Sequence, residues 1–330
     1  MALIRPLYLI GIGFSIAAAV AFSYTLQNDI KPLAVSISVS RTPLSSPFYI
    51  AEHQGFFKQA GVDIELIEVL GGHLSFNAMA KGSSDLATCS DTVIMFNSFK
   101  RSDFSVLTTF VQSDNDIKII GKRKSGNLTA AALKHQKIAV AKGSASEFFA
   151  QTYLMIEGID SASVTTINIA PEHMLQELQQ EQVAAISVWE PFAFKAMEQL
   201  QDDALIYPSK GLYNLTFNLV AKRSYIQQNT EQIRRVLQAL EMAIQFITEN
   251  PAASKAIIKT QLSLDDVFID WIWPDYLFKL SLNQTLLSTL ESEARWAIEN
   301  DLVETQEVPD YRQYIDSAPL VALEPWASTL

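Results

Sequence analysis

The chain has 330 residues, of which 48% are hydrophobic and 18% are charged, a composition that is typical of a folded globular protein and excludes a disordered chain. The formal net charge of −11 argues against nucleic acid or an anionic membrane surface as a partner. The single cysteine, Cys89, excludes an internal disulfide and a cysteine zinc cluster, and we predict that it is a small, partly buried strand residue.

The first 28 residues carry a long apolar run behind a basic residue. Arg5 is followed by uncharged sequence whose core extends from Leu7 to Phe22. This pattern is typical of a secretory signal, and Ala19–Ala21 offers small residues at cleavage spacing. The run from Leu7 to Leu26 is also 20 residues long, about the length that crosses a bilayer. Residues 1–28 are therefore predicted to be either a cleaved signal peptide or a membrane anchor.

An α/β pattern follows this segment. Alternating apolar residues predict strands at 33–39 and 62–69, and a continuous apolar run predicts a third at 86–89. Between and after them we expect a helix with Ser46 as its N-cap and Pro47 in its first turn, a short helix that ends at Gly82, and a helix that Ser90 or Asp91 caps. Strands that alternate with helices predict a parallel sheet with crossover connections.

The same pattern starts again further along the chain. A strand and a polar turn are predicted over 117–126. The elements expected after them are a strand at 137–141, a helix at 144–158, a strand at 164–169, a helix at 172–181, a strand at 183–188, and a helix at 189–200. The chain is therefore predicted to hold two similar α/β units.

The C-terminal third is predicted to be helical. Apolar residues from Ile233 to Ile247 recur at helical spacing on a long helix that should stop at Pro251. A second helix carries a similar stripe from Leu286 to Ile298. The strand-like segment at 212–222 could carry the chain back to the first unit, where these helices would find a surface to cover.

Four segments of the chain carry a resemblance to a known family. They are PFYIAEHQGFFKQAGVDIELIEV, AMAKGSSDLATCSDT, KIAVAKGSASEFFAQTYLMIEGI and QVAAISVWEPF. In this order and spacing they resemble periplasmic substrate-binding proteins of ABC importers, of the nitrate/sulfonate/taurine type, with which the thiamine-pyrimidine binders share a fold. The resemblance extends from about Leu33 to the C-terminus.

The resemblance implies an α/β, two-lobed periplasmic-binding-protein fold of type II. Each lobe would contain a mostly parallel sheet flanked by helices. The first lobe would comprise residues 32–120 and 218–330, and the second residues 121–217. Two connections would form a hinge between the lobes, and a solute bound between them would close it.

The ligands of open α/β sheets bind at the carboxyl ends of strands, beside helix N-termini whose N–H groups favour an anion. This rule selects five loops, at 42–46, 71–73, 90–92, 142–146 and 189–190. The candidate ligand-binding residues on or next to them are Arg41, Ser45, Ser46, Gly71, Gly72, Ser90, Asp91, Thr92, Gly143, Ser144, Ala145, Trp189 and Glu190. His73 is a weaker candidate that fits an ordinary turn equally well.

Several of these residues have a second interpretation. Ser144 and Glu147 also fit a capping box, in which the serine serves its own helix. Trp189 could stack on a ligand or pack in the core. Asp91 and Glu190 are unfavourable for a purely anionic ligand, so a heteroaromatic or zwitterionic solute stays open beside nitrate or a sulfonate.

The predicted function is capture of a small solute outside the cytoplasm and its delivery to the transmembrane permease of an ABC importer. No paired carboxylates or Ser-His arrangement falls on the predicted loops, so we expect no catalytic residues, no metal and no cofactor. A membrane-anchored solute sensor and an enzyme on the same fold are the alternatives.

Overall fold

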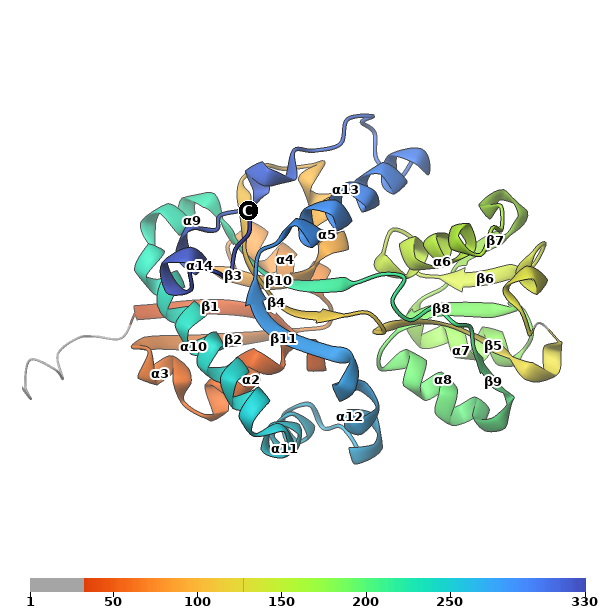
Figure 1. Cartoon of the computed structure of the whole chain (residues 1–330), viewed down its shortest axis with the longest axis horizontal. Helices are drawn as coiled ribbons and strands as arrows, with labels where there is room; N and C mark the ends of the chain where they lie inside the picture. The colour runs from red at the N-terminus through yellow and green to blue at the C-terminus, as the bar shows by residue number, and fades with distance from the viewer. Residues whose placement is uncertain (1–32, 127) are drawn as a thin grey trace, which may run out of the picture.

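The computed structural model describes residues 33–126 and 128–330, and within them the chain forms two β-sheets with helices on their faces (Figure 1). The predicted export signal or anchor at 1–28 lies outside the described residues. Among the helices described, none combines the length and the hydropathy that a bilayer-spanning helix requires. The two-lobed α/β fold is therefore confirmed, with the two sheets in separate halves of the molecule.

The first sheet has six strands in the order β11-β4-β10-β3-β1-β2. Their bounds are β1 Leu33–Ser40, β2 Val62–Val69, β3 Leu86–Ser90, β4 Phe104–Ser113, β10 Leu215–Lys222 and β11 Tyr276–Ser281. β1 pairs in parallel with β2 and β3, whereas β10 is antiparallel to both β3 and β4, and β11 is antiparallel to β4. The sheet is thus mixed rather than mostly parallel, because the chain that returns from the second sheet enters between β3 and β4.

The second sheet has five strands in the order β7-β6-β8-β5-β9. Their bounds are β5 Ile117–Lys122, β6 Lys137–Val140, β7 Thr165–Asn168, β8 Ala185–Trp189 and β9 Ala204–Ile206. β6 pairs in parallel with β7 and β8, and β5 is antiparallel to β8 and β9. The predicted parallel units are present in both sheets, and each sheet adds antiparallel strands to them.

Helices fill the connections and the C-terminal third. The α-helices are α2 Ser46–His53, α3 Phe56–Gln59, α4 Gly72–Lys81, α5 Asp91–Ser98, α6 Ala145–Ile156, α7 Pro171–Gln179, α8 Phe192–Leu200, α9 Arg223–Gln228, α10 Thr230–Glu249, α11 Pro251–Leu262, α12 Asp266–Ile272, α13 Gln284–Glu299 and α14 Ala318–Leu323. The predicted stop at Pro251 holds for α10, and the same proline opens α11 because it suits the first turn of a helix.

Two connections join the sheets. The first runs from β4 to β5 through Asp114–Asp116, and the second runs from β9 to β10 through 207–214. The lobe boundaries at 120/121 and 217/218 stay a proposal. β5 crosses the first boundary, since residues 117–122 all belong to the second sheet, and β10 crosses the second, since it begins at Leu215.

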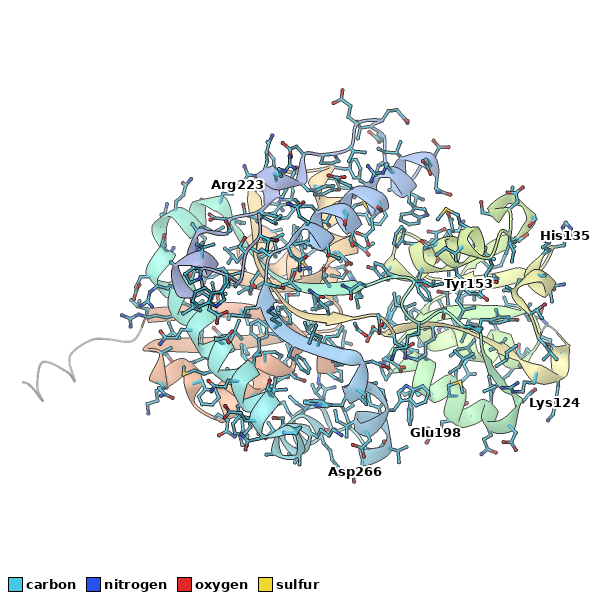
Figure 2. The ribbon with its side chains drawn as sticks, in the orientation of Figure 1. Lys124, His135, Tyr153, Glu198, Arg223 and Asp266 are labelled. Carbon is cyan, nitrogen blue, oxygen red and sulfur yellow. The ribbon has the colours of Figure 1, made fainter. Side chains whose placement is uncertain are left out.

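Apolar side chains fill the space between each sheet and its helices (Figure 2). In the first lobe, Phe48 of α2 packs edge-on against Phe110 of β4 with ring centroids 4.9 Å apart. In the second lobe, Tyr153 of α6 is 1% exposed and lies with its ring centroid 6.2 Å from that of Tyr207. These cores hold fixed the strand ends on which the candidate loops lie.

Candidate functional site

The five predicted loops follow β1, β2, β3, β6 and β8, each at the carboxyl end of its strand. α4 and α5 begin directly after two of these ends in the first lobe, and α6 begins after one in the second. A helix that starts at a strand end directs its first N–H groups to the space beyond the sheet. The local structure on which the site prediction depended is therefore present in both lobes.

The helix that follows β3 has the predicted N-cap. Ser90 directly precedes α5, and its hydroxyl accepts a hydrogen bond from Val93 N at 3.4 Å. Asp91 and Thr92 point into the protein, with exposed fractions of 0% and 3%. The Thr92 hydroxyl donates to Glu293 of α13 at 2.8 Å, and the Tyr213 hydroxyl lies between Asp91 and the same carboxylate.

The loop after β1 differs from its prediction in one detail. Thr42 caps a short 3-10 helix, η1 Pro43–Ser45, and α2 begins one residue later at Ser46. Ser46 is therefore not an N-cap, and its hydroxyl donates instead to Pro43 O at 2.5 Å. The buried hydroxyl of Ser45 forms no hydrogen bond within the described part of the chain.

Arg41 lies next to this loop but is already partnered. Its Nε atom is 3.3 Å from a carboxylate oxygen of Glu68, and its Nη2 donates to Leu262 O at 3.3 Å. The side chain is 39% exposed, so the ion pair is screened by water and holds it only loosely.

The two glycines after β2 have different roles. Gly71 has φ of +105°, a conformation that favours glycine over residues with a side chain. A Cβ on Gly72 would lie 3.0 Å from Cys89 Cα and 3.2 Å from Phe217 Cζ, so this glycine allows α4 to pack closely on β3. His73 is exposed at the start of α4. Cys89 itself is fully buried.

The loop after β6 shows the capping arrangement that was one of its two interpretations. The hydroxyl of Ser144 donates to Ala141 O at 2.6 Å and accepts from Ser146 N at 3.2 Å. The carboxylate of Glu147 accepts from Gly143 N at 2.8 Å, one residue earlier than a capping box requires. Gly143 has φ of +68°, a Cβ at its position would meet no atom within 4 Å, and Ala145 opens α6 beside it.

This geometry predicts that Ser144→Ala acts mainly on stability. Because the hydroxyl is already committed to its own helix, we expect the free energy of unfolding to fall by about 1 kcal/mol, the usual cost of a lost cap. Affinity for the solute should change little. Measuring the melting temperature and the dissociation constant of the same variant checks this, and a weaker affinity at unchanged stability would contradict it.

The loop after β8 places its two candidates in different environments. Trp189 is half-buried and packs edge-on against Phe192, with ring centroids 6.5 Å apart. Glu190 is 4% exposed, and its Oε1 accepts hydrogen bonds from Lys118 Nζ and Trp271 Nε1, both at 2.8 Å. Its Oε2 accepts from Phe194 N at 2.9 Å. Glu190 therefore has a full set of protein partners.

Glu190 also joins the two halves of the molecule. Lys118 is in β5 of the second sheet, whereas Trp271 is in α12, which packs beside α11 of the first lobe. The ring of Phe194 lies 5.1 Å from that of Phe268 and 6.0 Å from that of Trp271. We call this set the α8–α12 contact, and sequence reasoning missed it because its members lie far apart in the chain.

A second contact joins the lobes through α6 and α13. Phe148 of α6 packs edge-on against Trp296 of α13, with ring centroids 5.3 Å apart, and against Tyr213 at 5.4 Å. Trp296 Nε1 donates to the side-chain oxygen of Gln151 at 2.8 Å. We call this set the α6–α13 contact. The predicted apolar stripe of α13 gave no sign that its tryptophan would reach the second lobe.

The first connection between the sheets contains a buried acid. Asp116 is 5% exposed, and its Oδ1 accepts from the hydroxyl of Tyr276 at 2.8 Å. Burial raises the pKa of Asp116 to about 7, although the Tyr276 hydroxyl acts in the opposite direction. The negative charge at this connection is therefore sensitive to pH near neutrality.

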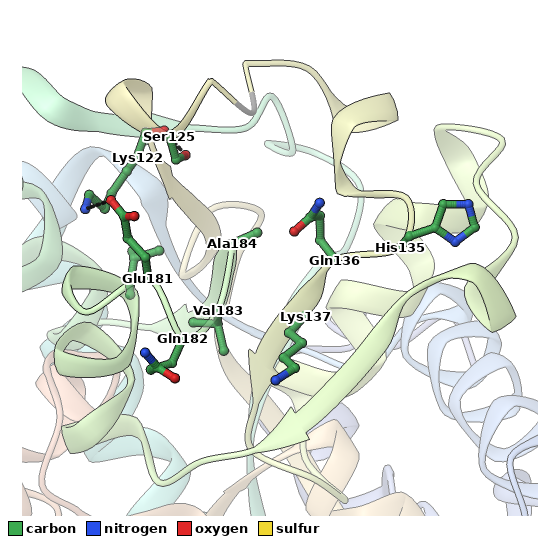
Figure 3. Close-up of a pocket in the computed structure, with 10 residues that line it drawn as sticks. Lys122, Ser125, His135, Gln136, Lys137, Glu181, Gln182, Val183 and Ala184 are labelled. Atoms are coloured by element: carbon green, nitrogen blue, oxygen red, sulfur yellow. Dashed lines mark hydrogen bonds and ion pairs between the residues drawn. The ribbon is translucent and has the colours of Figure 1, made fainter.

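A cavity of about 530 Å³ lies away from all of these loops, at the outer end of the second lobe (Figure 3). Lys122, Gln136, Lys137, Glu181 and Gln182 are among the residues that line it. It opens where β6 begins, whereas ligands of α/β sheets bind where strands end. Elsewhere in the described residues, no cluster of three or more His, Cys, Asp or Glu side chains is placed to hold a metal ion.

The sequence places this fold in a family. Residues 42–254 match the sequence profile described as NMT1/THI5 like, a match that includes strands of both sheets. The chain belongs to the NMT1/THI5-like family. The match covers the segments that carried the resemblance in the sequence-based prediction.

The chain is similar to curated relatives and to solved structures of other proteins. A putative aliphatic sulfonates-binding protein of Bacillus subtilis is 25% identical over 231 residues, which are 68% of each chain. The periplasmic aliphatic sulphonate binding protein SsuA of Escherichia coli superposes with a TM-score of 0.74 at 22% identity, over 86% of this chain and 97% of the other. The alkanesulfonate-binding SsuA of Xanthomonas axonopodis pv. citri gives 0.70 at 19%, over 84% and 96%. The two structural likenesses establish the fold alone.

Proposed function

We propose that this protein binds a small solute outside the cytoplasm and delivers it to the transmembrane permease of an ABC importer. The observation that carries the proposal is the family match over residues 42–254, which spans loops of both lobes. The names of the curated relatives support binding rather than catalysis. The solute would lie between the lobes, against the N-termini of α5 and α6, because both helices begin at strand ends.

The proposed ligand class is an aliphatic sulfonate or a similar small anion. The B. subtilis relative supports this class by name. Arg41 and Lys118 are each paired with a glutamate, whereas Lys142 is exposed on the loop after β6 and forms no ion pair with a described residue. Lys142 is therefore the group that we assign to the anionic end of the solute. A neutral thiamine-pyrimidine precursor is the competing ligand.

A thermal-shift screen with ethanesulfonate, taurine, nitrate and a hydroxymethylpyrimidine tests the proposal. A ligand at one hundred times its dissociation constant should add about 2.7 kcal/mol to the free energy of unfolding. Lys142→Ala should weaken sulfonate binding, and should leave pyrimidine binding unchanged because no charge is involved. Lys124→Ala, at the outer end of the second lobe (Figure 2), is the matched control and should alter neither. Saturable binding without product supports the proposal, and conversion of a solute to product would overturn it.

A further inference from the structure

Two carboxylates meet in the interior where α5, the second connection and α13 come together. Asp91 opens α5 and Glu293 lies on α13, and both are fully buried. Three hydroxyls surround them, from Thr92, Tyr213 and Thr216. We call these five residues the Asp91–Glu293 cluster.

Asp91 has the hydrogen-bond partners of an ionised carboxylate. Its Oδ1 accepts from the Tyr213 hydroxyl at 2.5 Å and from Thr92 N at 2.9 Å. Its Oδ2 accepts from Thr216 N at 2.9 Å and from the Thr216 hydroxyl at 3.2 Å. Each carboxylate oxygen thus faces a backbone N–H, which can only donate, and a hydroxyl that is oriented as a donor, so the site favours the ionised form of Asp91.

Glu293 has the opposite arrangement. Its Oε1 accepts from the Thr92 hydroxyl at 2.8 Å and lies 3.1 Å from the Tyr213 oxygen. Tyr213 has a single hydroxyl hydrogen, which the shorter 2.5 Å contact assigns to Asp91. The contact between Tyr213 and Glu293 therefore contains a hydrogen only if Glu293 supplies it.

Only the hydroxyls near Oε1 could stabilise a negative charge on Glu293, and burial and the charge of Asp91 outweigh them. Its second oxygen, Oε2, is buried and forms no hydrogen bond with any described residue. The titratable groups that face the cluster are Asp91 and Tyr213, with Cys89 on β3 and Tyr311 near α13, and none of them is basic. The carboxylate of Glu147, on the neighbouring α6, is bound to Gly143 N. Burial, and then the charge of Asp91, raise the pKa of Glu293 well above its ordinary range.

We propose that the Asp91–Glu293 cluster is a binding site for one proton, which Glu293 holds and donates to the oxygen of Tyr213. The cluster lies one helical turn from Trp296, through which α13 contacts α6 of the second lobe. Ionisation of Glu293 would place a second negative charge beside Asp91 in the interior and would separate α13 from α5. Loss of the proton therefore weakens the α6–α13 contact as well.

The direction of the pH dependence follows from this assignment. Glu293 retains its proton in the folded protein but loses it in the unfolded chain above the ordinary glutamate value of 4.5. Folding therefore takes up a proton above that pH. The contribution of the cluster to stability is complete below this value, and it declines as the pH rises toward the folded pKa of Glu293.

Two conservative variants test which carboxyl holds the proton. Glu293→Gln keeps the shape and the neutral state, so it should fold and should abolish the uptake of about one proton on folding. Asp91→Asn should destabilise the protein at every pH, because its amide hydrogens would face the Thr216 or Tyr213 donors. Calorimetric unfolding in buffers of different ionisation enthalpy measures the proton uptake.

An infrared spectrum provides a second readout, which needs only the wild type and Glu293→Gln and so can be used even if Asp91→Asn does not fold. Near neutral pH, the wild type should show a carbonyl band of protonated Glu293 that is missing from Glu293→Gln, whereas any band from Asp116, whose pKa is about 7, is common to both proteins. Equal proton uptake and equal bands in the wild type and Glu293→Gln would overturn the proposal. Loss of the band in a folded Asp91→Asn variant but not in Glu293→Gln would overturn the assignment to Glu293.

The effect on solute capture rests on the proposed function and has its own measurement. With ethanesulfonate as the probe, affinity should decrease with rising pH more steeply in the wild type than in Glu293→Gln, which retains only the titration of Asp116 and of the exposed groups. A pH dependence that is the same in both proteins would contradict the link between the cluster and the lobes. Absence of ethanesulfonate binding at any pH would count against the ligand class alone, because the proton uptake is measured without a ligand.

Discussion

Glu190→Leu is expected to lower the free energy of unfolding by about 3–5 kcal/mol, the typical cost of removing one member of a buried ion pair. The side chains of Lys118 and Glu190 are 3% and 1% exposed. Without Glu190, the ammonium of Lys118 would retain the carbonyl of Asn115 as a hydrogen-bond acceptor and the ring of Trp271, whose centroid is 5.5 Å away, but no paired carboxylate. The indole N–H of Trp271 would also lose its acceptor. Equilibrium unfolding in denaturant measures the loss.

Two control variants test whether the loss of stability comes from leaving one buried charge unpaired. Lys118→Met combined with Glu190→Leu removes both charges and should recover much of the stability that the single variant loses. Glu231→Ala breaks the exposed pairs of Glu231 with Arg234 and Arg235, and should change stability by less than about 1 kcal/mol. If Glu190→Leu lowered the free energy of unfolding no more than Glu231→Ala does, the role of the α8–α12 contact would be contradicted.

The second large effect is expected at Trp296. Its side chain is 8% exposed and packs against Phe148 and, with ring centroids 6.2 Å apart, against Phe96. Trp296→Ala should cost about 3–5 kcal/mol, as large-to-small changes of buried aromatic residues do. It should also weaken solute binding, because Phe148 then loses its partner from the first lobe. Denaturant unfolding and titration calorimetry on the same sample check both results.

A tryptophan elsewhere in the chain provides the matched control. Trp326 is 80% exposed, so Trp326→Ala should change stability by no more than about 0.5 kcal/mol. Trp296→Phe keeps the ring contacts but removes the hydrogen bond to Gln151. Its free energy of unfolding should lie between those of the two alanine variants. Equal stability of Trp296→Ala and Trp326→Ala would show that the α6–α13 contact is not formed in solution.

Much of the fold could be predicted because its parallel units alternate clearly between apolar strands and capped helices. The predicted strands at 33–39, 62–69 and 86–89 all appear as β1, β2 and β3. β4 was missed although it is the longest strand, since serine and threonine break its apolar run and their buried positions depend on the neighbouring strands. β9 and β11 are short or partly exposed and carry no comparable pattern.

The candidate site was predictable only where its residues are close in sequence. The caps at Ser90 and Ser144 follow from a serine between a strand and a helix. Trp271 meets Glu190 across 81 residues, and Thr92 meets Glu293 across 201 residues. Such pairs depend on how α12 and α13 return to the hinge, which no local spacing of residues encodes.

The position of β10 in the first sheet determines the order in which the two halves can form. β10 lies between β3 and β4, yet it follows the whole second sheet in the chain. A polypeptide that emerges from its N-terminus can therefore complete the second sheet while the centre of the first is still missing. Pairings between such distant segments form slowly. The first sheet should accordingly remain incomplete until about residue 222 has emerged.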